Sequence, residues 1–216
     1  ALAMAMGHVV LKEFYFDRRV PYFDDYARRY TDLPMLVLLE EQTLADGSKA
    51  LVPGRYLRAS DFDAKLGQNN NVEWKTVAFD DAGRAVLPQG SIGFRWGGEG
   101  RGDAGQWNLE AKDSDRRDVR LRLSVAEGGA VERAGVALPY FAGIETPHFT
   151  ANPQGGDVRV AQVPVAALDL GGGRKVQVAT VFDLQAAQFG VDDGRARSYD
   201  DNAPYTPAWA EKITGV

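Results

Sequence analysis

The first eleven residues form an almost wholly apolar segment. Its large side chains would fall on every face of a helix, with Leu2, Met6 and Val9 on one side and Met4 and Leu11 on another. A helix that is apolar all round is normally buried inside a larger structure. We therefore expect this segment to form a helix whose natural packing partners are missing, and we interpret the chain as a piece of a longer protein.

A second helix is predicted to begin at Pro21, because proline suits the first turn of a helix. Tyr22, Tyr26 and Tyr30 follow at intervals of four residues, which would place them on one face. An acidic pair near the start and an arginine pair near the end would both be stabilised by the helix dipole.

Beyond Pro34 the pattern changes from helical spacing to short apolar or alternating segments. Such segments, separated by turn residues, are typical of strands. Two hairpins are expected, one turning at 80–83 and one at the three glycines 171–173. The predicted strands cover residues 35–39, 74–79, 84–87, 119–125, 161–170 and 174–182.

The segment 119–125 alternates most regularly of these. Its odd-numbered residues, Val119, Leu121, Leu123 and Val125, are expected to face a core, while Arg120, Arg122 and Ser124 are expected to face water. Farther on, Asp183 is expected to cap a helix that runs through 184–188 and ends at Gly190.

This order of elements predicts an α+β fold, in which N-terminal helices are followed by a mainly antiparallel β region with short helices. We divide the chain into a helical segment at 1–32, a mainly antiparallel β region at 33–190, and a loop and short helix at 191–216. The glycine-rich stretches 97–105 and 152–157 are predicted to be mobile surface loops.

The composition is that of a globular domain and argues against several kinds of site. The chain has 216 residues, 44% of them apolar and 25% charged, and it contains no Cys. Without a thiol it cannot form a disulfide, a cysteine-ligated cluster or a cysteine nucleophile. A net charge of −5 argues against a nucleic-acid surface. The apolar opening is too short to span a bilayer and has no basic segment before it, so we predict neither a membrane span nor a signal peptide.

Two histidines remain, and neither has metal-site spacing. His8 is expected to contact other helices within the core, and His148 to lie in a loop. The glycines of 97–105 superficially resemble a phosphate-binding loop, but no Lys-Ser or Lys-Thr follows them. No Gly-x-Ser-x-Gly motif occurs, so a serine hydrolase is also disfavoured.

Two further possibilities stay open at this stage. A hydrolase with paired carboxylates would need two acidic groups to converge, and adjacent pairs occur at 24–25, 80–81, 192–193 and 200–201. Each pair also has a local use at a helix start or a turn. Alternatively, a stand-alone β-rich module could bind a carbohydrate or a partner protein through exposed aromatic side chains, for which the candidates are Trp74, Trp96, Trp107 and Trp209.

Several segments together resemble one family, the alpha subunit of respiratory, membrane-bound nitrate reductase, a molybdopterin oxidoreductase. The opening and closing segments look generic to molybdopterin oxidoreductases, whereas the middle ones look specific to nitrate reductases. The segments that carry the resemblance are 1–11, 22–40, 73–79, 90–97, 107–110, 198–201 and 205–216.

The resemblance implies that this chain is an internal fragment of a quinol:nitrate oxidoreductase that reduces nitrate to nitrite in anaerobic respiration. It further implies that 1–32 belongs to a larger cofactor-binding domain, that 33–190 is a β insert domain, and that 191–216 returns to the parent domain. The parent would carry molybdenum on molybdopterin guanine dinucleotide and a [4Fe–4S] cluster, with an iron–sulfur beta subunit and a membrane heme subunit as partners. It would lie at the cytoplasmic face of the inner membrane. No catalytic or metal-ligating residue of the family can be assigned to this chain, its cofactor-binding residues stay unknown, and the isolated chain is expected to bind no cofactor and to be inactive.

Overall fold

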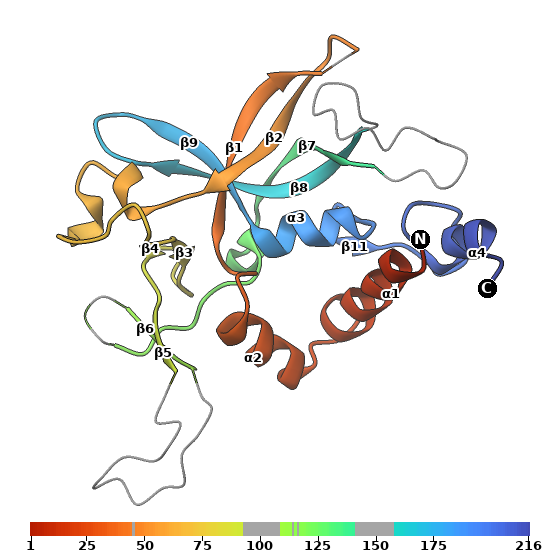
Figure 1. The fold of residues 1–216 in the computed structure, drawn as a ribbon, viewed down its shortest axis with the longest axis horizontal. Coiled ribbons are helices and arrows are strands. Elements are labelled where there is room, and N and C mark those ends of the chain that lie inside the picture. The colour runs from red at the N-terminus through yellow and green to blue at the C-terminus, as the bar shows by residue number, and fades with distance from the viewer. Residues whose placement is uncertain (45, 93–108, 114, 116, 141–157) are drawn as a thin grey trace, which may run out of the picture.

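The structure is a computed structural model that describes residues 1–44, 46–92, 109–113, 115, 117–140 and 158–216. Two predictions about loops, at 97–105 and 152–157, fall outside these residues, as do those about His148, Trp96 and Trp107. The described part is an α+β arrangement in which helices lie beside a β barrel (Figure 1), as the sequence predicts.

The helices of the described part include the two predicted near the N-terminus. A π-helical turn, Lys12–Phe16, continues directly from the first helix. Short 3-10 turns occupy Ala59–Asp61, Lys65–Gly67 and Val125–Gly128. The α-helices are α1 (Leu2–Leu11), α2 (Pro21–Tyr30), α3 (Val181–Gln188) and α4 (Pro207–Thr214).

Five strands close into a barrel in the order β1-β2-β7-β8-β9. Its neighbouring strands are antiparallel, except that β2 and β7 run parallel where Leu51 pairs with Val136. The barrel strands are β1 (Leu36–Thr43), β2 (Lys49–Tyr56), β7 (Glu132–Pro139), β8 (Val158–Asp169) and β9 (Lys175–Thr180). Three two-stranded sheets accompany it: β3 (Ala78–Phe79) with β4 (Ala85–Val86), β5 (Gln89–Ile92) with β6 (Leu109–Lys112), and β10 (Val191–Asp192) with β11 (Arg195–Ala196).

The predicted hairpins are present, although the first is shorter than predicted. Its strands pair only over two residues each, and Trp74 lies outside them in a turn. Gly83 in the turn has a φ of +79°, which glycine adopts without steric cost. The second hairpin joins β8 and β9 through the three predicted glycines, all of which have positive φ.

Three predictions of local structure are wrong: the strand at 119–125, the exposure of Ser124 and the N-cap of α3. Residues 119–125 do not form a strand; Leu121 makes a single bridge to Asp80, and a 3-10 turn begins at Val125. Backbone groups that would pair with another strand are taken by side chains, because Arg28 donates to the carbonyl of Leu121 and Glu127 accepts from the amide of Leu123. Leu121, Leu123 and Val125 are nevertheless buried as predicted.

Ser124 differs from the prediction as well, since it is 5% exposed and not on the solvent side. Its hydroxyl accepts from the amide of Ala126 and so caps the 3-10 turn, which draws it inward. In α3 the capping residue is Thr180, one turn before the predicted Asp183, and the Thr180 Oγ1 accepts from the Asp183 amide at 3.0 Å.

The core consists of packed clusters around and beside the barrel. One is centred on Leu36, Val77 and Val178 at one end of the barrel, and another joins the barrel to α3. A third cluster connects the helical segment to α3 through contacts among Leu11, Tyr15, Ala27, Leu123 and Phe182. The helical segment is therefore packed against the β region, and the polar site described next lies in that same interface.

Candidate functional site

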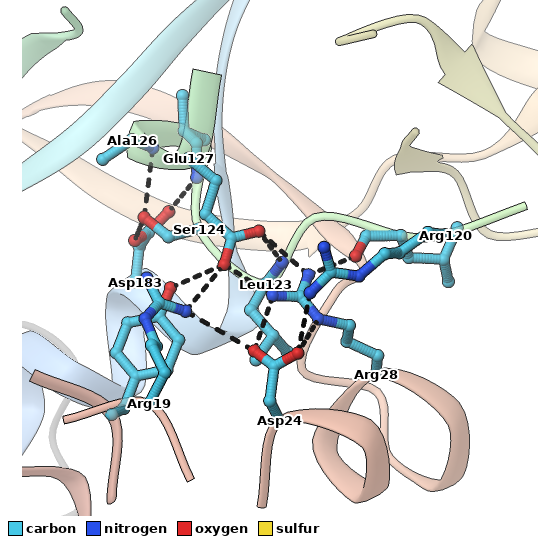
Figure 2. A network of polar contacts seen from close by, with 12 residues as sticks. Arg19, Asp24, Arg28, Arg120, Leu123, Ser124, Ala126, Glu127 and Asp183 are labelled. Carbon is cyan, nitrogen blue, oxygen red and sulfur yellow. Dashed lines mark hydrogen bonds and ion pairs between the residues drawn. The ribbon is translucent and has the colours of Figure 1, made fainter. Parts of the chain in front are cut away.

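A network of charged side chains lies where the helical segment meets the chain at 120–128 (Figure 2). Arg19 and the residues of α2 contribute from one side. Arg120, Ser124 and Glu127 contribute from the other, and Asp183 enters from α3. The α2 residues are more than ninety positions away from their partners at 120–127, and Ser124 is 59 away from Asp183, so the network forms only in the folded chain.

Glu127 is the centre of this network. Its carboxylate accepts from two nitrogens of Arg28 at 2.6 and 2.9 Å, and from Arg19 and the Tyr15 hydroxyl at 2.9 Å each. The amide of Leu123 adds a fifth bond at 3.1 Å. Its four oxygen lone-pair directions are thus fully engaged. Arg19 is further fixed by its position 3.4 Å from the centre of the Tyr15 ring, a cation–π contact.

Asp24 is the second carboxylate that binds Arg28. It forms a two-pronged contact with Arg28 at 2.7 and 2.8 Å and accepts from Arg120 at 2.8 Å. The Arg28 side chain is only 6% exposed, so its charge needs these carboxylates. Helical spacing places Asp24 and Arg28 one turn apart on α2, which is why the sequence can position them together.

The pKa values show that these carboxylates are held ionised. Burial would raise the pKa of Asp24, but hydrogen bonds and charge from Arg28 and Arg120 outweigh it and lower that pKa to about 2. Burial would also raise the pKa of Glu127, but the hydrogen bonds and charge of Arg28 and the hydrogen bond from Arg19 outweigh it and lower that pKa. Burial and the nearby Glu127 raise the pKa of the Tyr15 hydroxyl. None of the three can exchange a proton near neutral pH, so the cluster serves to hold the structure rather than to carry out acid–base chemistry.

Asp183 is the buried carboxylate next to this cluster. It accepts from the Ser124 hydroxyl at 2.6 Å, the Val125 amide at 2.9 Å and the Thr180 hydroxyl at 2.8 Å. Burial raises its pKa to about 6, although these hydrogen bonds oppose the shift. Through them Asp183 ties the start of α3 to the 3-10 turn.

A pocket of about 240 Å³ opens between these two groups. Tyr15 and Arg19 line one wall, Glu127 and Asp183 line another, and Arg133 of β7 enters from the barrel. The Nη1 atom of Arg133 is buried and has no hydrogen-bond partner in the described part of the chain.

His8 is a core residue, as the sequence predicts. Its ring is fully buried, with Nδ1 2.7 Å from the carbonyl of Phe189 and Nε2 3.2 Å from that of Arg197. These contacts join α1 to the chain that follows α3. Within the described ranges, no three His, Asp or Glu side chains converge as a metal site would require.

The acidic pairs do not form a hydrolase site in the described residues. Asp24 and Asp25 share an open pocket with Asp81, but each of the first two is paired with an arginine of α2. A general acid needs a raised pKa, and Asp24 has the opposite shift. The other pairs have local uses: Asp80 binds Arg84, Asp192 binds Arg159, and Asp201 accepts from the Ser198 amide.

The tryptophans that are described do not form a binding platform. Trp74 is 84% exposed, as expected, but Trp209 of α4 is wrongly predicted to be exposed: it is 7% exposed and packs edge-on against Tyr205, which precedes that helix. A sugar-binding surface built from both is therefore excluded. No helix in the described ranges combines the length and apolarity needed to cross a bilayer.

Glu127 and Arg133 were not identified from the sequence. Each lies in a segment that reads as ordinary surface, Glu127 in Ala-Glu-Gly-Gly and Arg133 in Val-Glu-Arg-Ala. The only local clue was the acidic and basic spacing on α2, which identifies Asp24 and Arg28 but not their distant partners.

Comparison with known proteins supplies the relationship. No family model matches the chain. Over its full length the chain is 49% identical to the respiratory nitrate reductase 2 alpha chain and to the respiratory nitrate reductase 1 alpha chain of Escherichia coli strain K12, and it spans 17% of each. It is 36% identical to the nitrate reductase alpha chain of Bacillus subtilis strain 168, of which it spans 16%. The resemblance predicted from the sequence is confirmed: along its whole length, this chain is homologous to a segment of the respiratory nitrate reductase alpha chain.

Proposed function

We propose that the chain works as a structural and subunit-contact segment of the alpha subunit of a quinol-linked nitrate reductase. The observation that supports this most strongly is the 49% identity that extends over the entire chain. At that level the same fold and the same packing surfaces are expected in the relatives.

The reaction itself, reduction of nitrate to nitrite, is proposed for the whole alpha subunit with its molybdenum centre and iron–sulfur clusters. The described residues of this chain do not fit the role of metal ligands. The sequence has no Cys, and the described residues offer no converging group of three His, Asp or Glu side chains. We therefore assign no step of the reaction to them.

Within the parent, the proposed roles follow the division into 1–32, 33–190 and 191–216. The first and last segments would belong to the larger cofactor-binding domain, and the middle one would be an insert that contacts the iron–sulfur beta subunit. A membrane heme subunit would complete the complex at the cytoplasmic face of the inner membrane. The exposed apolar residues of α1, such as Leu2, Met6 and Val10, are consistent with a helix that packs against more of the protein.

A chimera tests this proposal. The chain would replace the matching segment in the Escherichia coli nitrate reductase 2 alpha chain, and nitrite formation from nitrate would be measured with a reduced viologen dye. We expect the chimera to be active, a version lacking the segment to be inactive, and the isolated chain to contain no molybdenum. A folded, abundant chimera without activity would contradict the proposal, as would an isolated chain that holds stoichiometric molybdenum and forms nitrite.

A further inference from the structure

Both ring nitrogens of His8 face backbone carbonyl oxygens. The Nδ1 atom lies 2.7 Å from the carbonyl oxygen of Phe189, and Nε2 lies 3.2 Å from that of Arg197. A neutral imidazole has a proton on only one nitrogen, so it can donate to only one of these carbonyls. Its other nitrogen would direct a lone pair at an oxygen. An imidazolium donates from both nitrogens, and the two acceptors therefore match the doubly protonated ring.

The two carbonyls depend on this ring for a donor. Within the described ranges, no backbone amide outside the regular helices and strands donates to either of them. Phe189 is the C-cap residue of α3, and the carbonyls at the C-terminal end of a helix carry partial negative charge that favours a cation. The ring is also fully buried, so water does not reach a nitrogen that lacks its proton. A neutral ring would thus leave one carbonyl without its donor.

The cations on the neighbouring elements are paired with carboxylates or exposed. The Lys12 ammonium, one turn beyond His8, donates to the Asp17 carboxylate at 2.7 and 2.9 Å. The Arg197 guanidinium lies 3.6 Å from the Asp192 carboxylate. Two further charged residues, both exposed, lie on α4, which packs against α1: Glu211 and Lys212. Among the described residues, these elements therefore place no unpaired buried cation against an imidazolium at His8.

The tyrosines near the ring are hydrogen-bonded elsewhere. Tyr199 packs edge-on against His8, with ring centres 6.4 Å apart, and its hydroxyl donates to the Glu13 carboxylate at 2.7 Å. Burial and this hydrogen bond raise the pKa of Tyr199 to about 12, so its hydroxyl stays neutral over the pH range in which a histidine titrates. The Tyr205 hydroxyl accepts from the Gln188 amide at 3.3 Å. The ring of His8 is thus the group in this contact that can gain or lose a proton near neutral pH.

We propose that His8 is a proton-dependent clamp on α1. In its doubly protonated form it donates to both carbonyls and holds α1 against the chain that follows α3. When the ring loses one proton, one carbonyl loses its donor and faces a nitrogen lone pair, so α1 is held less firmly. A Cβ on Gly190 would lie 3.2 Å from Nδ1, so the backbone packs closely against the ring. The inference rests on this geometry and does not depend on the proposed function.

Nitrogen NMR of the chain with isotope-labelled histidine tests the protonation state directly, because a protonated ring nitrogen and one with a lone pair resonate far apart. The chain has two histidines, and His148→Gln assigns the signals. We expect both nitrogens of His8 to be protonated at pH 7. Raising the pH should remove one proton and shift the backbone amide signals of α1 and Gly190 at the same midpoint. A lone-pair nitrogen in His8 at pH 7 would overturn the proposal, as would amide signals that do not follow the ring.

Urea unfolding at pH 6 and pH 9 measures the coupling to stability. A histidine in an unfolded chain has a pKa of about 6.5, so above that pH the folded chain would hold one proton more than the unfolded chain, and stability should fall as the pH rises. We expect the folding equilibrium constant of the wild type to fall about tenfold more than that of His8→Gln, whose amide does not titrate.

The matched control is His148→Gln, which removes the other histidine and should show the same fall as the wild type. Equal falls for the wild type and His8→Gln would overturn the proposal, because the proton on His8 would then not be linked to folding. Should His8→Gln fail to fold, the NMR measurement on the wild-type ring decides.

Discussion

Replacing Glu127 with Gln would remove one of the two carboxylate oxygens at the centre of the network while keeping the size of the side chain. If the amide oxygen takes the position that binds Tyr15 and Arg19, the new NH2 group faces Nη1 of Arg28 and the amide of Leu123, which are both donors. The opposite orientation loses more contacts. At least two hydrogen bonds to the ionised carboxylate are thus lost, one from the Arg28 guanidinium and one from the Leu123 amide.

The size of the effect follows from these contacts. A hydrogen bond to a charged group contributes about 1.5–3 kcal/mol, so the loss of two such bonds costs at least about 3 kcal/mol. Arg28 keeps its two bonds to Asp24, so the full penalty of an unpaired buried charge does not arise. We therefore expect Glu127→Gln to lower the free energy of unfolding by about 3 kcal/mol.

Urea unfolding followed by circular dichroism measures this change. With a slope of about 2–3 kcal/mol per M for a chain of this kind, the midpoint should fall by about 1 M. The matched control is Glu41→Gln, which removes the charge from an exposed ion pair with Lys49 and should leave the midpoint near that of the wild type. Equal midpoints for the two variants would refute the reasoning, because the buried network would then contribute no more than a surface pair.

Two more predictions concern Gly190, which lies against Pro204, and Asp24 of the network. Gly190 has a φ of +88°, and a Cβ there would lie 2.7 Å from the carbonyl oxygen of Pro204, so Gly190→Ala should cost about 2–3 kcal/mol in urea unfolding. Gly47→Ala, where φ is +82° with nothing within 4 Å, controls for φ alone; equal losses would show that the close contact contributes nothing. The pKa of Asp24 is lowered to about 2 in the folded chain, so the unfolded chain binds more protons between pH 4 and 2. The free energy of unfolding therefore falls on acidification through that range. Asp24→Asn should remove about 1–2 kcal/mol of this fall, a value that allows for solvent screening, when urea unfolding is compared from pH 5 to 2. A variant whose stability falls with pH as steeply as that of the wild type would contradict the assignment.

The elements that the sequence predicted well are those with strong local patterns. Pro21 and the charges of α2 define a helix without help from the rest of the chain, and the three glycines at 171–173 define a hairpin. The barrel was not predicted, because β2 contains Pro53 and Gly54 and β7 contains Gly135, which weaken the strand pattern. Closure depends on the parallel pairing of β2 with β7, a contact between distant segments that no local pattern reports.

The segment 119–125 shows why a good alternating pattern can still fail. Burial of Leu121 and Leu123 satisfies the period of two, so the interior and exterior sides were largely correct. The backbone hydrogen bonds of this segment depend on distant or non-strand partners. Arg28 donates to the Leu121 carbonyl and Glu127 accepts from the Leu123 amide, where a neighbouring strand would otherwise pair. The candidate site escaped sequence reasoning for the same reason: its partners are brought together by tertiary packing.

The polar network also fixes the orientation of α1 relative to the barrel. The π-helical turn at 12–16 continues α1 without a break, and it carries Tyr15, which Glu127 and the Arg19 guanidinium hold in place. Buried ion pairs add little net stability compared with apolar packing, but they allow only one geometry to satisfy every group. Because Arg28 is bound to both Asp24 and Glu127, the helical segment has one orientation relative to the barrel. Helix α1 lies beside α4 (Figure 1), and Met6 and Val10 of α1 are exposed. The charged interface therefore fixes the direction in which the exposed apolar face of α1 points.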